Sequence, residues 1–157
     1  MLPNEIFEKL RSVYSDQIIE LIENHPSDSF ITVNASALFE ICHSLRDEAF
    51  FMFDYLMSLT GMDLGENLGV VYHLYSMQLK HKIVIKAFVP KEQPKVPSVE
   101  RIWRTADWHE REAYDLIGVN FEGHHNLIRI LLPYDWEGYP LRKDYTAPEM
   151  YHGMKVS

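Results

Sequence analysis

The densest group of chemically reactive side chains lies in residues 107–132, DWHEREAYDLIGVNFEGHHNLIRILL, where carboxylates, arginines and histidines alternate with aromatic and aliphatic residues. Two carboxylates can act together as a general acid and a general base. Glu110 and Glu112 are two residues apart, however, and in a helix such residues point to different faces. They cannot flank one substrate bond, so we expect no acid–base catalysis from this pair.

The histidines of the same stretch raise the alternative of a metal site. A stand-alone metal-dependent hydrolase would use His109, Glu112, His124 and His125. Their spacing matches no familiar zinc motif, and His-Glu-Arg-Glu-Ala is not the H-E-x-x-H signature. We therefore predict no metal ligands, and we interpret His124 as a loop residue whose ring bonds to the backbone.

Other catalytic and cofactor signatures are missing from the sequence. Neither serine nor cysteine sits in a strained, glycine-flanked turn. The segments GMDLG and GENLG lack the spacing of a phosphate-binding loop. Cys42, the single cysteine, occupies a helical apolar position and is interpreted as a buried thiol. One cysteine excludes an internal disulfide and a four-thiolate iron–sulfur cluster, and we expect no catalytic residue and no cofactor in this chain.

A helix is required to position the reactive residues. Asp107 followed by Glu110 resembles a capping box, and Gly118 suits a left-handed C-cap. These signals predict one short helix over residues 108–117.

The predicted helix places a carboxylate on an apolar stripe. The stripe consists of Ala106, Glu110, Ala113 and Ile117. A buried carboxylate needs a cation or several donors, and Arg129 and Arg142 are the candidate partners of Glu110. Arg111 and Asp115 are four residues apart and are expected to pair with each other.

The chain after Gly118 is rich in proline but also in aromatic residues. Residues 131–150 read LLPYDWEGYPLRKDYTAPEM, in which the prolines prevent a long helix. Arg, Tyr and Trp are the residue types that anchor protein–protein contacts. We predict an extended arm that binds a partner; the alternative is an arm folded back on its own domain.

The rest of the chain predicts an α+β domain with helices on a small mixed sheet. Apolar spacing predicts a helix over 4–23 and a second helix capped by Ser36, with Phe39, Cys42, His43 and Leu45 facing inward. Strands are expected at 29–33, 50–61, 70–76 and 82–89, followed by a proline-rich loop at 90–99. Residues 1–106 would form this domain, and residues 107–157 a helix plus arm within the same compact unit.

Composition limits the possible partners and locations. The formal net charge is -8 and no basic patch is present, which argues against nucleic acid and against direct binding to an anionic membrane surface. The N-terminus MLPNEIFEKL lacks the bases and apolar core of a signal peptide. The longest apolar stretch is too short to span a bilayer. We expect a cytosolic protein without an anchor of its own.

Several words of the C-terminal third occur together in one known family. EREAYDLIG (110–118), FEGH (121–124), RILLP (129–133) and GYPLRKDY (138–145) resemble the 30-kDa-type subunit of respiratory complex I, the proton-pumping NADH–quinone oxidoreductase. The resemblance implies a non-catalytic scaffold subunit of the peripheral arm, on the cytoplasmic side of the membrane and held there by the complex. It implies flavin and iron–sulfur clusters in other subunits only, and docking on a neighbouring subunit of the quinone module that resembles a hydrogenase large subunit.

The resemblance also implies which residues form the junction of helix, arm and partner. These are Glu110, Arg111, Glu112, Asp115, Phe121, His124, Arg129, Pro133, Trp136, Pro140, Leu141, Arg142, Lys143, Asp144 and Tyr145.

The chain departs from the family pattern at two places. His125 stands where the family usually has proline, and Ile128 precedes Arg129 where two bases are common. The same subunit type also occurs in membrane-bound hydrogenases and ferredoxin-driven complexes, so the electron donor stays open.

Overall fold

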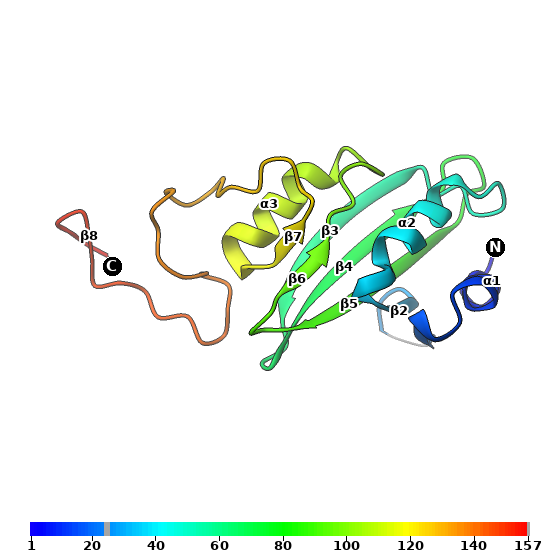
Figure 1. Cartoon of the computed structure of the whole chain (residues 1–157), viewed down its shortest axis with the longest axis horizontal. Coiled ribbons are helices and arrows are strands. Elements are labelled where there is room, and N and C mark those ends of the chain that lie inside the picture. Colours follow the sequence, from blue (N-terminus) through cyan, green and yellow to red (C-terminus); the bar gives the residue numbers. More distant parts are fainter. Residues whose placement is uncertain (24–25, 157) are drawn as a thin grey trace.

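A five-stranded mixed sheet forms the body of the molecule in the computed structural model, which describes residues 1–23 and 26–156 (Figure 1). Its strands are β1 (Ile18–Ile22), β2 (Phe30–Asn34), β3 (Tyr55–Asp63), β4 (Asn67–Tyr75) and β5 (Lys82–Pro90), in the order β1-β2-β5-β4-β3. Only β2 and β5 pair in parallel, and the other neighbours are antiparallel. The alternation of apolar residues in β4 and β5 predicts both strands correctly, because it gives the sheet one apolar face.

Three helices pack on that face: α1 (Pro3–Tyr14), α2 (Leu38–Asp47) and α3 (Ala106–Ile117). Each contributes buried side chains to a single core, among them Leu10 from α1, Cys42 from α2 and Ala113 from α3. Cys42 is completely buried, as expected, and burial raises the pKa of its thiol. The predicted α+β class, with helices on a small mixed sheet, is confirmed.

The predicted helix over 4–23 is wrong in its second half. Helix α1 ends at Tyr14, the turn η1 (Ser15–Gln17) follows, and Ile18–Ile22 form β1. Ser15 takes a positive φ of 46°, which reverses the chain. Ile-Ile-Glu-Leu-Ile fits a helical pattern, but pairing with β2 and the β-branched residues favour the strand.

Three further boundaries differ from expectation. Residues 50–54 form an irregular turn, so the predicted strand 50–61 becomes β3 at Tyr55–Asp63. Asn34, not Ser36, caps the next helical segment, η2 (Ala35–Ala37), by accepting a hydrogen bond from the Ser36 N–H. His43, expected to face inward, is exposed.

Two short strands that the sequence did not predict bring the junction together. β6 (Lys95–Pro97) lies in the loop predicted at 90–99 and pairs in parallel with β7 (Asn120–Glu122), directly after α3. The pairing places residues 98–104 beside residues 121–127.

The arm leaves the body after β7 and extends to the far end of the molecule, where β8 (Met150–Tyr151) and β9 (Met154–Lys155) form a small hairpin (Figure 1). The predicted short helix and extended irregular arm are confirmed. Among the described residues, no helix is long and apolar enough to cross a bilayer.

Candidate functional site: the helix–arm junction

Glu110 is completely buried, but its partners are not the predicted arginines. Its carboxyl accepts hydrogen bonds from the Ser98 hydroxyl at 2.6 Å and the Val99 N–H at 2.8 Å. Burial raises the pKa of Glu110 to about 8, although these two hydrogen bonds lower it. Glu110 therefore fixes the turn before α3 and does not take part in the predicted capping box.

Asp115 is the buried carboxylate that holds an arginine. Its Oδ1 lies 2.9 Å from Arg129 Nη1, and its Oδ2 accepts the consecutive backbone N–H groups of Ile130, Leu131 and Leu132. Burial opposes ionisation, but these hydrogen bonds prevail and hold the pKa of Asp115 below its usual value. The expected pair of Asp115 with Arg111 is wrong, because Asp115 faces the arm.

Arg142 forms a second attachment of the arm, at the C-terminal end of α3. Its Nε donates to the Ile117 carbonyl at 2.6 Å, and its guanidinium stacks 4.5 Å from the Tyr139 ring centroid. Arg142 thus caps carbonyls that the helix leaves unpaired. Gly118 is left-handed with φ 83°, as predicted, and a Cβ there would meet Arg142 and Tyr139 within 2.7 Å.

Asp63, at the end of β3, forms a third attachment. Its carboxylate accepts the Gly65 N–H and the Lys143 N–H, each at 2.8 Å, and the Lys91 ammonium at 3.0 Å. The two backbone hydrogen bonds, ahead of Lys91, lower the pKa of Asp63 to about 2. Lys91 also contacts Asp144 at 3.1 Å, so the arm is held by charges on both sides.

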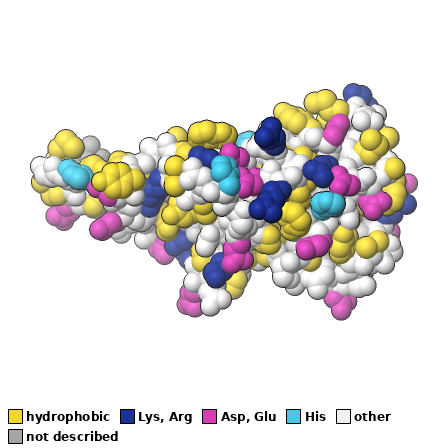
Figure 2. Space-filling view, turned by 45° about the horizontal axis from the view of Figure 1, so that its top comes forward, with side chains coloured by type: hydrophobic (Ala, Val, Ile, Leu, Met, Phe, Trp, Pro, Cys, Tyr) yellow, Lys and Arg dark blue, Asp and Glu magenta, His cyan; other side chains and the backbone are white. Residues whose placement is uncertain are grey.

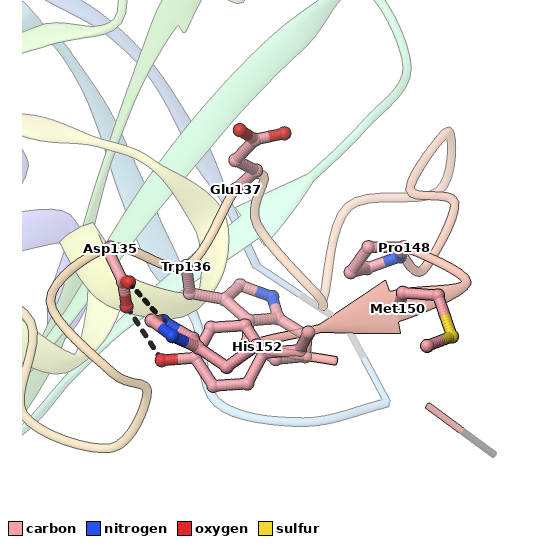
Figure 3. Close-up of a pocket in the computed structure, with 7 residues that line it drawn as sticks. Asp135, Trp136, Glu137, Pro148, Met150 and His152 are labelled. Carbon is pink, nitrogen blue, oxygen red and sulfur yellow. Dashed lines mark hydrogen bonds and ion pairs between the residues drawn. The ribbon is translucent and has the colours of Figure 1, made fainter. Parts of the chain in front are cut away.

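The distal part of the arm folds on itself. Asp135 accepts hydrogen bonds from Tyr151 Oη at 2.7 Å and from His152 Nε2 at 2.6 Å, as the dashed lines in Figure 3 show. Trp136 packs 5.2 Å from the Tyr151 ring and donates its indole N–H to Tyr145 Oη at 3.1 Å. The arm is therefore an ordered segment in the isolated chain.

His124 joins α3 to the loop after β7. Its side chain is fully buried, and its Nε2 lies 3.1 Å from the Asp107 carbonyl and 3.0 Å from Asp107 Oδ1. The prediction that His124 bonds to backbone is confirmed. Arg111 also pairs with Asp107, at 2.9 Å, and lies 4.8 Å from the Trp108 ring.

The residues of the remote hydrolase hypothesis are not brought together. His124 and His125 join Glu100 and Asp107, whose donor atoms all lie within 4.8 Å of one another, while His109 and Glu112 lie outside this group. The two carboxylates carry no sequence signal as ligands, because the four residues come from three separate segments.

The fifteen predicted junction residues divide into two classes. Inward-facing residues hold the arm and helix together: Glu110, Arg111, Asp115, Phe121, His124, Arg129, Trp136, Arg142 and Tyr145. Pro140 is half-buried. Solvent-facing residues are Glu112, Pro133, Leu141, Lys143 and Asp144, although Lys143 and Asp144 also attach to the body as described above.

Sequence reasoning missed several residues of the junction. Asp63 and Lys91 come from the β3–β4–β5 region, and Ser98 from the loop after β6. All three act across long sequence separations, and no local pattern distinguishes them.

Large apolar side chains line the outer side of the arm. Leu131 is 63% exposed, Tyr134 92% and Leu141 60%. Figure 2 shows hydrophobic side chains next to acidic ones along the arm. An ordered segment that presents such side chains is a candidate surface for a protein partner.

Known proteins share both the sequence and the fold. The family model described as respiratory-chain NADH dehydrogenase, 30 Kd subunit, matches residues 31–151. A subunit of the NADH-quinone oxidoreductase of Chloroherpeton thalassium is 47% identical over 98% of this chain and 65% of its own length. The subunit with the same name in Chlorobium phaeobacteroides is 39% identical over 96% and 92%, respectively. The chain thus spans about two thirds of the first relative and nearly all of the second.

Two solved structures resemble the fold. A trypsin-resistant fragment of Nqo5 superposes with a TM-score of 0.65 at 25% identity, covering 79% of this chain and 98% of the fragment. A chain of an archaeal membrane-bound sulfane sulfur reductase gives 0.74 at 23% identity, covering 91% and 85%. The sequence relatives and the matched family model together establish that this chain belongs to the respiratory-chain NADH dehydrogenase 30 Kd subunit family.

Proposed function

We propose that the chain is a non-catalytic scaffold subunit of the peripheral arm of a proton-pumping NADH–quinone oxidoreductase. Its arm docks on the hydrogenase-large-subunit-like protein of the quinone module and contacts other hydrophilic-arm subunits. The chain lies on the cytoplasmic side of the membrane and is held there by the complex. Flavin and iron–sulfur clusters belong to other subunits.

One observation carries the proposal. The arm is fixed to the body by buried polar contacts of Asp115, Arg142 and Asp63, yet its apolar side chains face solvent. Preorganisation of this kind lowers the entropy that binding must overcome. The relatives are named as subunits of an NADH-quinone oxidoreductase, which supports the choice of assembly.

A second candidate is the equivalent subunit of a related membrane-bound complex. The fold of the sulfane sulfur reductase chain is consistent with this alternative, because that protein is an archaeal respiratory membrane complex. The two candidates differ in the electron-donor subunits that accompany the chain.

The test is to isolate the affinity-tagged chain from its native membranes and identify the accompanying subunits by mass spectrometry. We expect a hydrogenase-large-subunit-like protein and NADH-oxidising subunits. Deletion of residues 133–157 should leave the α+β body folded and remove this partner. Full retention of the partner after deletion would contradict docking through the arm, and a different set of donor subunits would favour the second candidate.

A further inference from the structure

Glu100, Asp107, His124 and His125 form a compact group of oxygen and nitrogen donors at the root of the arm. They come from the loop after β6, the first turn of α3 and the loop after β7. Their donor atoms lie within 4.8 Å of one another, and a surface hollow lined by Glu100, Asp107 and His125 opens onto them. We propose that these four residues bind one divalent transition metal ion of the zinc class.

The spacing of the donors suits a small tetrahedral ion. With bonds of about 2.0–2.1 Å, the ligand atoms around zinc are about 3.3–3.5 Å apart. His124 Nε2 lies 3.0 Å from Asp107 Oδ1 and 3.5 Å from Glu100 Oε2, and His125 Nδ1 lies 2.7 Å from Glu100 Oε2. Shifts of a few tenths of an ångström open this group to the size of the ion.

The surrounding contacts favour a fixed site. The His124 side chain is fully buried and aimed at the two carboxylates, and its ring stacks on that of His125 at 5.1 Å. Two carboxylates neutralise a dication, while two imidazoles favour zinc over calcium and magnesium, which prefer oxygen ligands. Four protein ligands leave no open position, so the ion would be structural and not catalytic.

The metal replaces two hydrogen-bonded protons. The Asn126 N–H donates to His124 Nδ1, so His124 carries its proton on Nε2, facing Asp107 and Glu100. His125 donates from Nδ1 to Glu100 and receives a weak contact at Nε2 from Arg111. On binding, each proton moves to the other ring nitrogen, so the Asn126 and Arg111 contacts are lost and both rings stay neutral.

Positive neighbours limit the affinity. Arg111 binds Asp107 at 2.9 Å, and Arg101 and Arg104 line the hollow. Figure 2 shows Lys and Arg side chains beside Asp, Glu and His in the middle of this face. The inference is independent of the proposed function, because a structural ion at this position only crosslinks three segments of the chain's own body.

The experiment is a calorimetric titration of the full, untagged chain with zinc chloride, with magnesium and calcium chloride for comparison. We expect one zinc ion per chain, and a Kd raised about tenfold or more by His125→Ala and by Glu100→Gln. His43→Ala is the matched control, because His43 is 52% exposed beside Asp47 at 3.2 Å and should not change the Kd.

Two outcomes would overturn the proposal: absence of stoichiometric zinc binding, or equal affinity in wild type and His125→Ala. His125 is 60% exposed, so this variant should fold. A measurement on the wild type stays decisive if it does not. Cobalt should give the strong visible absorption of a four-coordinate site, and the side-chain nitrogen NMR signals of His124 should show the proton moving to Nδ1. Weak six-coordinate absorption with unchanged signals would also contradict the site.

Discussion

Asp115 Oδ1 lies 2.9 Å from Arg129 Nη1, so a buried carboxylate of α3 holds the base of the arm. The other oxygen of Asp115 accepts three consecutive backbone N–H groups, and the Leu131 side chain between them projects to solvent. The same contact therefore fixes the arm and determines which side of it faces outward.

Asp115→Asn should destabilise the chain by about 3–5 kcal/mol, because it leaves Arg129 without its charged partner in a buried position. Urea denaturation monitored by circular dichroism measures this change in the free energy of unfolding. Asp47→Asn, which removes an exposed carboxylate beside Arg46, is the control and should cost less than about 1 kcal/mol. Equal effects of the two substitutions would contradict the assigned role of Asp115.

Glu110→Gln at pH 7 should be much milder than Asp115→Asn. Burial raises the pKa of Glu110 to about 8, and its hydrogen-bond donors, Ser98 and Val99, are uncharged. The neutral amide keeps an acceptor for the Val99 N–H. Glu110→Ala, in contrast, leaves a cavity and an unpaired donor, and should cost about 2–4 kcal/mol. Thermal unfolding of both variants gives the comparison; a Gln variant as unstable as the Ala variant would show that Glu110 is needed in its charged form.

Gly118→Ala should destabilise the chain more than Gly123→Ala. Both glycines have φ 83°, so alanine is strained by about 1–2 kcal/mol at either position. A Cβ at Gly123 meets nothing within 4 Å, whereas one at Gly118 would meet Arg142 and Tyr139 within 2.7 Å. The difference in unfolding free energy between the variants isolates this clash, and a difference near zero would mean that the arm does not pack on the end of α3.

Acid should loosen the attachment at Asp63. Its folded pKa is about 2, below the ordinary value of 3.8, so the native state binds fewer protons than the unfolded state between these values. The stabilisation by Asp63 is therefore complete above about pH 4 and is lost as the pH falls towards 2. The difference in stability between wild type and Asp63→Asn should shrink over this range, whereas exposed Asp16→Asn should show no such trend. A constant difference would refute the sign of the shift.

The elements that sequence patterns predicted correctly have strong local periodicity. Strands β4 and β5 alternate, and α3 carries an apolar stripe that ends at Gly118. Strand β1 was missed because Ile18, Leu21 and Ile22 also fit helical spacing, and only pairing with β2 decides between the two. Strands β6 and β7, of three residues each, stabilise each other across the sequence and leave no local signal.

The junction was located by sequence, but its pairings were not. The buried position of Glu110 follows from the helical stripe, whereas its partner Ser98 depends on the β6–β7 pairing. Arg111 and Asp115 have the spacing of an ion pair, yet Arg111 turns to Asp107 and Asp115 to Arg129. Helical spacing shows which residues can meet, and tertiary packing selects among them.

The most direct test of docking through the outer side of the arm is the amount of hydrogenase-large-subunit-like partner that co-purifies with Leu131→Ser/Tyr134→Ser. The control is Val13→Ser/Leu64→Ser, whose side chains are 69% and 51% exposed away from the arm. Both variants should fold. The loss of central apolar contacts at an interface costs about 2 kcal/mol or more, so the arm variant should recover at least about tenfold less partner than the control. Equal recovery from both variants would contradict a partner-binding role for the arm.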